Sequence, residues 1–181
     1  AAVQADTPRG EVLVSGTYAG AANAFAYFDD GGTPLNEADD RTTRRRNAHV
    51  DAGGLLVRHR ARVAGWRLTT IGLGGADEQG VPGLGTDQAR STSLERQRVF
   101  AALRAERARW PSERADIAFV AGGSLQWQHY RDEADELGLG AQDDRERSWL
   151  VLTGVRPTLH IGSHAVLRGV LDWTGAGLHT D

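Results

Sequence analysis

The sequence predicts an all-β fold: an antiparallel up-and-down meander of about seven strands that forms part of a transmembrane outer-membrane β-barrel. Segments 115–127 and 159–173 alternate apolar or small residues with polar ones, which gives each strand one apolar and one polar face. Both segments are about twice as long as the usual strand of a soluble protein. The connections between strands also alternate between long and short, as the extracellular loops and periplasmic turns of such barrels do.

Seven segments are predicted as strands, and the evidence differs along the chain. The fourth is rich in strong helix formers, so a helix is the alternative there. A strand would place Val99, Ala101 and Leu103 on one face, and the alternation of the neighbouring segments favours this reading. In the second and sixth segments both faces carry apolar residues, so their facing stays open. The strands are expected at residues 11–18, 48–61, 66–74, 94–107, 114–129, 148–154 and 158–173.

The long connections carry clustered charge, for example the four arginines of 41–46 and the seven acidic residues of 131–147. Gly-Gly, Pro-Gly and Asp-Asp pairs mark them as loops or turns. In an up-and-down meander alternate connections fall on the same side. We therefore expect the three long loops to lie together at one end of the sheet and to make any ligand contact. The long connections are expected at 19–47, 75–93 and 130–147, and the short ones at 62–65, 108–113 and 155–157.

The five tryptophans fit this topology. Trp127, Trp149 and Trp173 fall at the proposed extracellular ends of three neighbouring strands, whereas Trp66 and Trp110 fall on the side of the short turns. Tryptophan favours the membrane–water boundary because its ring is apolar and its N–H needs a partner. The positions predict two aromatic girdles; the alternative is five scattered core residues.

Composition narrows the class of protein. The 181 residues suffice for one domain, yet only 40% are hydrophobic, and no apolar run approaches the roughly 20 residues of a membrane-spanning helix. The absence of cysteine excludes disulfides and cysteine-based metal sites. A net charge of −3 gives no reason to expect a nucleic-acid partner. Without an initiator methionine or a signal peptide, the chain is expected to be a processed product or an excised piece.

Several short motifs occur in an order and spacing found in one family of membrane proteins. Residues 26–36 contain the run Phe28-Asp29-Asp30-Gly31-Gly32-Thr33, residues 44–48 read Arg-Arg-Arg-Asn-Ala, and residues 79–83 read Gln-Gly-Val-Pro-Gly. From residue 11 to residue 173 the chain resembles the early-to-middle barrel of TonB-dependent outer-membrane receptors. That family has an aromatic-Asp-Asp/Asn-Gly-Thr loop element, an Arg-Asn-Asn-like strand start and a Gly-(Val/Ile)-Pro-Gly loop. Here Asn47-Ala48 departs from the Asn-Asn version.

The resemblance implies active uptake of a scarce ligand, such as a siderophore, cobalamin, haem or an oligosaccharide, across the outer membrane of a Gram-negative bacterium. The implied partners are a small-molecule ligand such as a metal chelate, outer-membrane lipid, and the TonB system acting through a plug domain that this chain lacks. The family barrel has 22 strands, so seven strands correspond to about a third of it. Two alternatives remain open. One is a complete eight-stranded barrel that acts as an adhesin or structural protein and needs an eighth strand before Gly10. The other is a soluble β-rich binding domain.

Two sets of candidate residues follow, and we expect no catalytic residue, no metal site and no bound cofactor. The first set lies in the first long loop, where its charges could capture an anionic ligand or bind Ca²⁺, or could simply form a solvated, arginine-paired loop. The second set would line the lumen. Ser163, beside His160 and His164, is a weak candidate nucleophile because it would face away from both histidines. The ligand-binding candidates are Tyr27, Asp29, Asp30, Arg41, Arg44 and Arg45; the lumen-lining candidates are Gln126, Gln128, His160, His164, Arg168 and Asp172.

Strict alternation also predicts which way the side chains of two strands point. The apolar set should point outward from the sheet, and the polar set toward its concave side. The four polar residues of the last strand recur at intervals of four, about 13 Å apart, which is too far to share one metal ion. The outward set is Ile117, Phe119, Leu125, Leu159, Ile161, Leu167 and Leu171; the concave set is Asp116, Gln126, His160, His164, Arg168 and Asp172.

Overall fold

The computed structural model describes residues 1–8, 10–33, 35–162 and 164–181. These residues contain strands and turns and no helix, and the strands follow one another in an antiparallel meander, which confirms the all-β prediction. The strands are β1 (Ala2–Thr7), β2 (Gly10–Ala21), β3 (Ala26–Asp29), β4 (Arg41–Arg44), β5 (Val50–Val63), β6 (Trp66–Gly80), β7 (Ser93–Arg107), β8 (Ala115–Asp132), β9 (Gln142–Ile161), β10 (Ala165–Arg168) and β11 (Leu171–Thr180).

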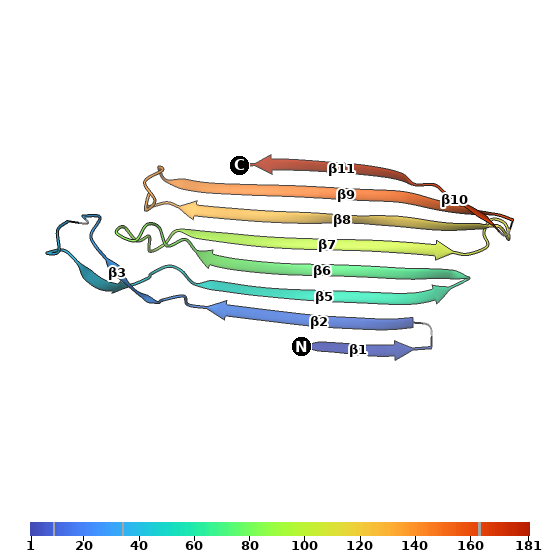
Figure 1. The fold of residues 1–181 in the computed structure, drawn as a ribbon, viewed down its shortest axis with the longest axis horizontal. Helices are drawn as coiled ribbons and strands as arrows, with labels where there is room; N and C mark the ends of the chain where they lie inside the picture. Colours follow the sequence, from blue (N-terminus) through green and yellow to red (C-terminus); the bar gives the residue numbers. More distant parts are fainter. Residues whose placement is uncertain (9, 34, 163) are drawn as a thin grey trace.

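Nine of these strands form one sheet in the order β1-β2-β5-β6-β7-β8-β9, followed by β10 and β11, which both pair with β9. Because β10 and β11 share one edge, the sheet is eight strands wide. Figure 1 shows these strands side by side in a single layer, with the β3–β4 hairpin standing beyond the ends of β2 and β5. Among the described residues β1 and β11 do not pair with each other, so the sheet has two open edges.

The pairing register assigns every strand residue to one of two faces, because directly opposed residues of antiparallel strands point to the same side. Phe119 is opposite Ala105 and Val155, whereas Gln126 is opposite Arg98 and Ser148. We call the face of Phe119 the apolar face and the face of Gln126 the polar face. Of the residues predicted to point outward, Ile117, Phe119, Leu125, Leu159, Ile161, Leu167 and Leu171 all share the apolar face.

The apolar face carries a broad band without ionised side chains. Between the row of Leu68 and the row of Gly74, none of its residues is Asp, Glu or Arg on any strand of the sheet. On β6, the residues of this face from Trp66 to Ala76 include no Asp, Glu or Arg. This segment is about 34 Å long at ~3.4 Å per residue. Charged residues of this face return at both ends of the band: Arg147 lies opposite Trp127 toward the long connections, and Arg107 lies opposite Ile117 at the turn end.

The sheet has almost no core of its own. Among the described residues the buried hydrophobic side chains are three alanines, Ala61, Ala89 and Ala118. Large side chains such as Leu103, Leu125 and Val151 remain exposed. A single layer cannot bury apolar side chains against a second layer, which is how soluble domains are stabilised.

The structure corrects the last third of the predicted meander. β9 runs unbroken through Pro157 to Ile161, and the chain returns as β10 and β11, with Gly162 and His164 in turn conformation between β9 and β10. The carbonyl oxygen of Pro157 accepts the N–H of Gly169 at 2.9 Å, so its ring nitrogen faces the same edge, where the ladder is interrupted between β10 and β11. Because no strand residue pairs there, a backbone N–H at residue 157 would have no acceptor. This explains why a proline, which lacks that N–H, is tolerated inside a long strand. The predictions overturned are the strands 148–154 and 158–173 and the turn 155–157.

Elsewhere the predicted strands are present and longer, except that β5 keeps the predicted length of 14 residues and is shifted by two. β7 is a strand, as the alternation favoured, although its composition favours helix. β6 continues to Gly80, β8 to Asp132 and β2 to Ala21, so the long connections shorten. β1 was not among the seven predicted strands; it occupies the segment before Gly10 that an eight-stranded arrangement requires. The tight β5–β6 turn consists of Ala64 and Gly65, both with positive φ, as the two-residue hairpin turn demands.

Candidate functional site

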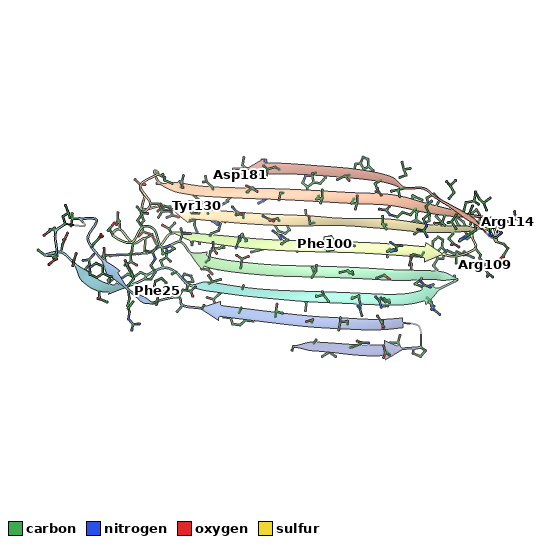
Figure 2. The ribbon with its side chains drawn as sticks, in the orientation of Figure 1. Phe25, Phe100, Arg109, Arg114, Tyr130 and Asp181 are labelled. Carbon is green, nitrogen blue, oxygen red and sulfur yellow. The ribbon has the colours of Figure 1, made fainter. Side chains whose placement is uncertain are left out.

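The three long connections meet at one end of the sheet, as predicted. Figure 2 labels Phe25 and Tyr130 at this loop end, and Arg109 and Arg114 at the opposite turn end. The Tyr27 hydroxyl donates a hydrogen bond to the carbonyl oxygen of Gly85, which joins the first loop to the second. Glu136 of the third loop accepts hydrogen bonds from the second. We call this set of interlocked loops the loop cluster.

A carboxylate joins the second and third loops. Glu136 Oε2 accepts the backbone N–H groups of Arg90, Ser91 and Thr92 at 2.7, 2.8 and 3.1 Å, and also the Thr92 hydroxyl. These hydrogen bonds, that of Ser91 foremost, lower the pKa of Glu136 from 4.5 to about 2. The buried Asp132 accepts the N–H of Glu136 and shares the single hydroxyl proton of Thr92 with Glu136, so both acidic groups organise backbone around them.

The first long loop folds as the β3–β4 hairpin, and most of its candidate ligand-binding side chains have partners within the chain. Asp29 is buried and accepts two hydrogen bonds from Arg41, at 3.0 and 3.1 Å. The guanidinium of Arg45 donates to the Gly83 carbonyl and lies 5.9 Å from the centre of the Tyr27 ring. Asp30 caps the following turn through the N–H of Gly32. Arg44 ends β4 of this hairpin, and its backbone carbonyl accepts a hydrogen bond from the side-chain amide of Gln88.

Several large apolar side chains project from the loop cluster, beside exposed charged residues such as Glu37 and Arg90. Leu35, Leu84 and Leu139 each lie in a different loop, with exposed fractions of 100%, 76% and 73%. Phe25 and Phe28 of the hairpin are exposed as well. The outer surface of the cluster therefore combines exposed leucines with exposed charged residues, while other charged residues, such as Glu136 and Arg45, hold the loops to one another.

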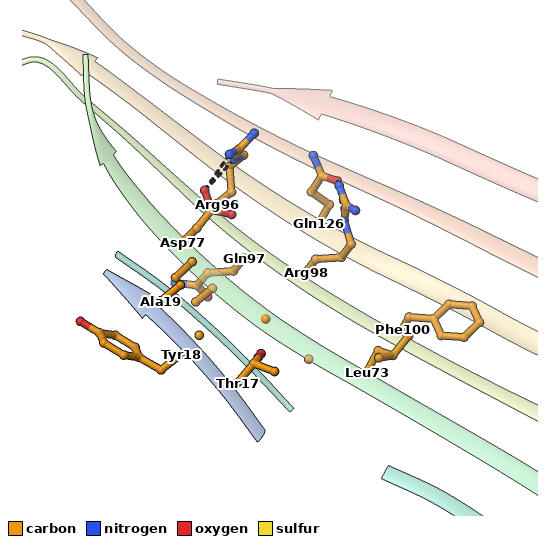
Figure 3. Close-up of a pocket in the computed structure, with 16 residues that line it drawn as sticks. Thr17, Tyr18, Ala19, Leu73, Asp77, Arg96, Gln97, Arg98, Phe100 and Gln126 are labelled. Atoms are coloured by element: carbon orange, nitrogen blue, oxygen red, sulfur yellow. Dashed lines mark hydrogen bonds and ion pairs between the residues drawn. The ribbon is translucent and has the colours of Figure 1, made fainter. Parts of the chain in front are cut away.

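A hollow of about 560 Å³ opens on the sheet in the half nearest to the loop cluster. Figure 3 shows Arg96 directed at Asp77, whose carboxylate it contacts at 2.8 Å, and Arg98 beside Gln126. Arg98 donates two hydrogen bonds to the Gln126 side-chain oxygen, at 2.6 and 3.0 Å. Phe100 borders the hollow on the side away from the loops. Gly54 and Gly75 face each other on the polar face and leave the floor of the hollow without side chains, and the backbones of Gly53 and Gly74 also line it.

The candidate lumen-lining residues share the polar face but not one site. Gln126 borders the hollow. His160 lies near the turn end, with its Nε2 2.8 Å from Asp116. Asp172 forms a bidentate pair with Arg156, at 2.7 and 3.3 Å. The prediction for His164 is wrong, because this residue lies in the turn that follows β9 and not on a strand. Gln128 and Arg168 share the polar face in β8 and β10, opposite Arg96 and Thr158 respectively.

Two further predictions concern the tryptophan girdles and Ser163. The prediction for Trp173 is wrong, because this residue does not lie at the loop end. It is opposite Thr153 on β9, four residues farther from the loop end than Trp149. Trp66 and Trp110 do lie together at the turn end, with ring centres 5.8 Å apart. Ser163 lies outside the described residues, so its proposed chemistry has no structural counterpart here. So does Pro34 of the motif at 26–36.

The residues that organise this site were not singled out by sequence reasoning. Asn47 donates its side-chain amide to the carbonyl oxygens of Val81 and Thr92, which links the start of β5 to the second loop. Glu136 and Asp132 were counted only as loop charges. Arg96 and Asp77 face each other because of the β6–β7 register, which the sequence pattern did not specify.

Within the described ranges no group of three or more His, Asp or Glu side chains is arranged to hold a metal ion. The part of the chain that the structure describes has no helix long and apolar enough to cross a membrane. No protein-family model matches this chain, and no curated protein sequence matches it.

Proposed function

We propose that this chain is part of the wall of an outer-membrane β-barrel of the TonB-dependent receptor type. In this proposal it contributes lipid-facing strands, lumen wall and extracellular loops for the uptake of a scarce small-molecule ligand such as a metal chelate. The observation that supports it is the single-layer sheet with one face free of ionised side chains across its middle rows. The opposite face carries charged and amide side chains such as Arg98 and Gln126.

Exposed apolar side chains are the energetic argument for lipid. Each large aliphatic side chain left in water forgoes roughly 1.5–3 kcal/mol that burial would provide. The apolar face presents many of them, including Leu55, Val99 and Leu159. A bilayer solvates such side chains, and a sheet whose backbone polar groups pair between strands meets the demand of the hydrocarbon core.

The dimensions of the apolar band are also those of a membrane. Strands in barrels tilt by about 40° from the barrel axis. The stretch of about 34 Å between Trp66 and Ala76 would then project to about 26 Å, close to the ~25 Å apolar band of outer-membrane barrels. Trp66 and Trp110 would lie at the periplasmic boundary, and Trp127 and Tyr18 near the extracellular one.

In this orientation the loop cluster is extracellular, and the glycine-floored hollow lies on the lumen side beneath it. The exposed leucines Leu35, Leu84 and Leu139 would meet the ligand first. The charged walls of the hollow, formed by Arg96 and Arg98, would receive an anionic chelate next. Coupling to TonB would require a plug domain, which the described residues do not contain.

A complete eight-stranded barrel is the second candidate, and one observation favours it. The sheet is eight strands wide and its edge strands β1 and β11 run antiparallel, so they could pair with each other and close an even-numbered barrel. In the structure they lie on opposite sides of an open sheet (Figure 1), which fits a segment of a wider barrel better. A disulfide trap separates the two candidates. One cysteine at Gln4 on β1 would be combined in turn with a cysteine at each position of β11, because closing tilted strands into a barrel offsets the two edges along the strand. Some of these pairs would crosslink within one chain in the small barrel, and none would in a wider one.

Uptake measurements test the proposed function. Replacing Leu84 and Leu139 together by serine should reduce ligand uptake into cells severalfold, while surface labelling shows the receptor normally displayed. Arg114→Ala, at the turn end, serves as the matched control and should leave uptake unchanged. Unchanged uptake of every ligand in a broad panel by the leucine variant would remove the loop cluster from ligand capture.

A further inference from the structure

A second hollow, of about 520 Å³, lies at the turn end of the sheet, far from the loop cluster. It spans β6, β7, β8 and β9 and reaches the interruption between β10 and β11 at Gly169 and Val170. Its lining contains six arginines against two acidic residues. The arginines are Arg62, Arg67, Arg104, Arg107, Arg156 and Arg168, and the acids are Glu106 and Asp116.

The acids do not neutralise this charge. Glu106 contacts Arg104 at 2.7 Å and Arg67 at 3.9 Å, and so is shared between two guanidinium groups. Asp116 is engaged by His160 at 2.8 Å rather than by an arginine side chain. Asp172, just beyond the lining, pairs with Arg156 at 2.7 Å.

Three arginines of the hollow have no carboxylate partner among the described residues; Arg107 is one of them and lies over the Trp66 ring, and Arg62 and Arg168 are the other two. Within the ranges that the structure describes, neither Arg62 nor Arg168 has a carboxylate oxygen within 4.0 Å. Both are exposed, and by register both belong to the polar face, as do Arg67, Arg104 and Arg156. Each guanidinium offers a planar set of N–H donors that matches the oxygen spacing of a phosphate.

We propose that this hollow binds a soluble, multiply charged phosphate compound of about the size of a diphosphate. The positive charge is concentrated in one compact hollow rather than spread along a groove, which suits a small anion better than an extended acidic peptide. The hollow opens mainly on the polar face, away from the apolar band, so a soluble phosphate compound has access and a lipid headgroup does not. The choice of a soluble compound over a lipid headgroup rests on the proposed function, in which the apolar band faces lipid, whereas the binding of phosphate itself depends only on these side chains.

The test is titration calorimetry of the full protein in detergent micelles with inorganic pyrophosphate, at a low ionic strength of about 20 mM so that screening is weak. The variant Arg62→Gln/Arg168→Gln removes the two guanidinium groups without leaving an acid unpaired. Its affinity for pyrophosphate should fall by about tenfold or more, given the strength of charge-assisted hydrogen bonds. The control Arg90→Gln/Arg147→Gln removes the same charge at the loop end and should bind within about twofold of the unmodified protein.

Every outcome bears on the proposal. Loss of binding in the first variant alone, with an unchanged far-ultraviolet circular dichroism spectrum, supports it. No binding of pyrophosphate to the unmodified protein, or equal affinity in both variants, overturns it. Two further probes identify a different ligand. Binding of dihexanoyl phosphatidic acid without pyrophosphate would indicate a lipid headgroup, and binding of an oligoglutamate peptide without pyrophosphate would indicate an acidic protein segment; either result contradicts the proposal.

Discussion

Glu136 accepts the backbone N–H of Ser91 at 2.8 Å, and this contact ties the loop after β8 to the loop after β6. The neighbouring N–H groups of Arg90 and Thr92 converge on the same oxygen. The arrangement shows how a highly charged loop acquires a defined shape, because acidic residues such as Glu136 and Asp132 bind backbone N–H groups.

Protonation of Glu136 should loosen this contact. Its pKa is lowered from 4.5 in the unfolded chain to about 2 in the folded protein. The contact therefore contributes fully above pH ~4.5 and is lost as the pH falls through about 2. Glu136→Gln should speed amide hydrogen exchange at Arg90, Ser91 and Thr92 at pH 6. The difference from the unmodified protein should shrink toward pH 2, and a difference that does not change with pH would contradict this role.

Val151 tests the apolar band at its centre. It lies on β9 opposite Gly123 and Gly175, in the middle row of the apolar face. Val151→Arg should lower the free energy of unfolding in lipid by roughly 2–4 kcal/mol, the cost of an arginine at the bilayer midplane. Urea titration of the protein refolded in vesicles measures this change.

The matched control for Val151→Arg is Ser124→Arg. Ser124 lies on the polar face, in the row next to that of Val151, opposite Phe100 and Leu150. It should cost no more than about 1 kcal/mol, because a lumen-facing arginine stays in water. Equal costs at the two positions would mean that both faces have the same surroundings.

Ala64 is strained in the β5–β6 turn. Its φ of 48° lies in the left-handed region, which an alanine adopts at a cost of roughly 1 kcal/mol. Asparagine is favoured at this position of a two-residue hairpin turn because it tolerates positive φ. Ala64→Asn should therefore raise the free energy of unfolding by about 0.5–1 kcal/mol. The control Ala108→Asn, outside that turn, should give no gain in the same denaturant titration.

The sequence predicted the fold class, the two faces and the meeting of the long loops, because all three depend on alternation and connection length. Phe119 and Gln126 fall on opposite faces as their parity requires. The β9–β10 turn was misplaced because Pro157 is a turn signal in most contexts. Its tolerance here depends on a gap in the neighbouring ladder, which only the tertiary structure creates.

The candidate site was less predictable. Tyr27 and Arg45 were identified as loop residues of interest, but their partners lie about forty to sixty residues away along the chain, at Gly83 and Gly85. Contacts of this kind depend on loop conformation rather than on periodicity. The pairing of Arg96 with Asp77 depends on a register that alternation alone leaves open.

The most direct test of the central claim uses the absence of cysteine, which lets a single spin label be placed at any position. Labels at each residue from Trp149 to Val155 on β9 would be compared in lipid vesicles for collision with oxygen, which concentrates in lipid, and with a nickel chelate, which stays in water. We predict that the ratio of the oxygen collision rate to the nickel collision rate alternates with a period of two, with oxygen favoured at 149, 151, 153 and 155. A ratio without alternation, or one with oxygen favoured at 150, 152 and 154, would contradict it.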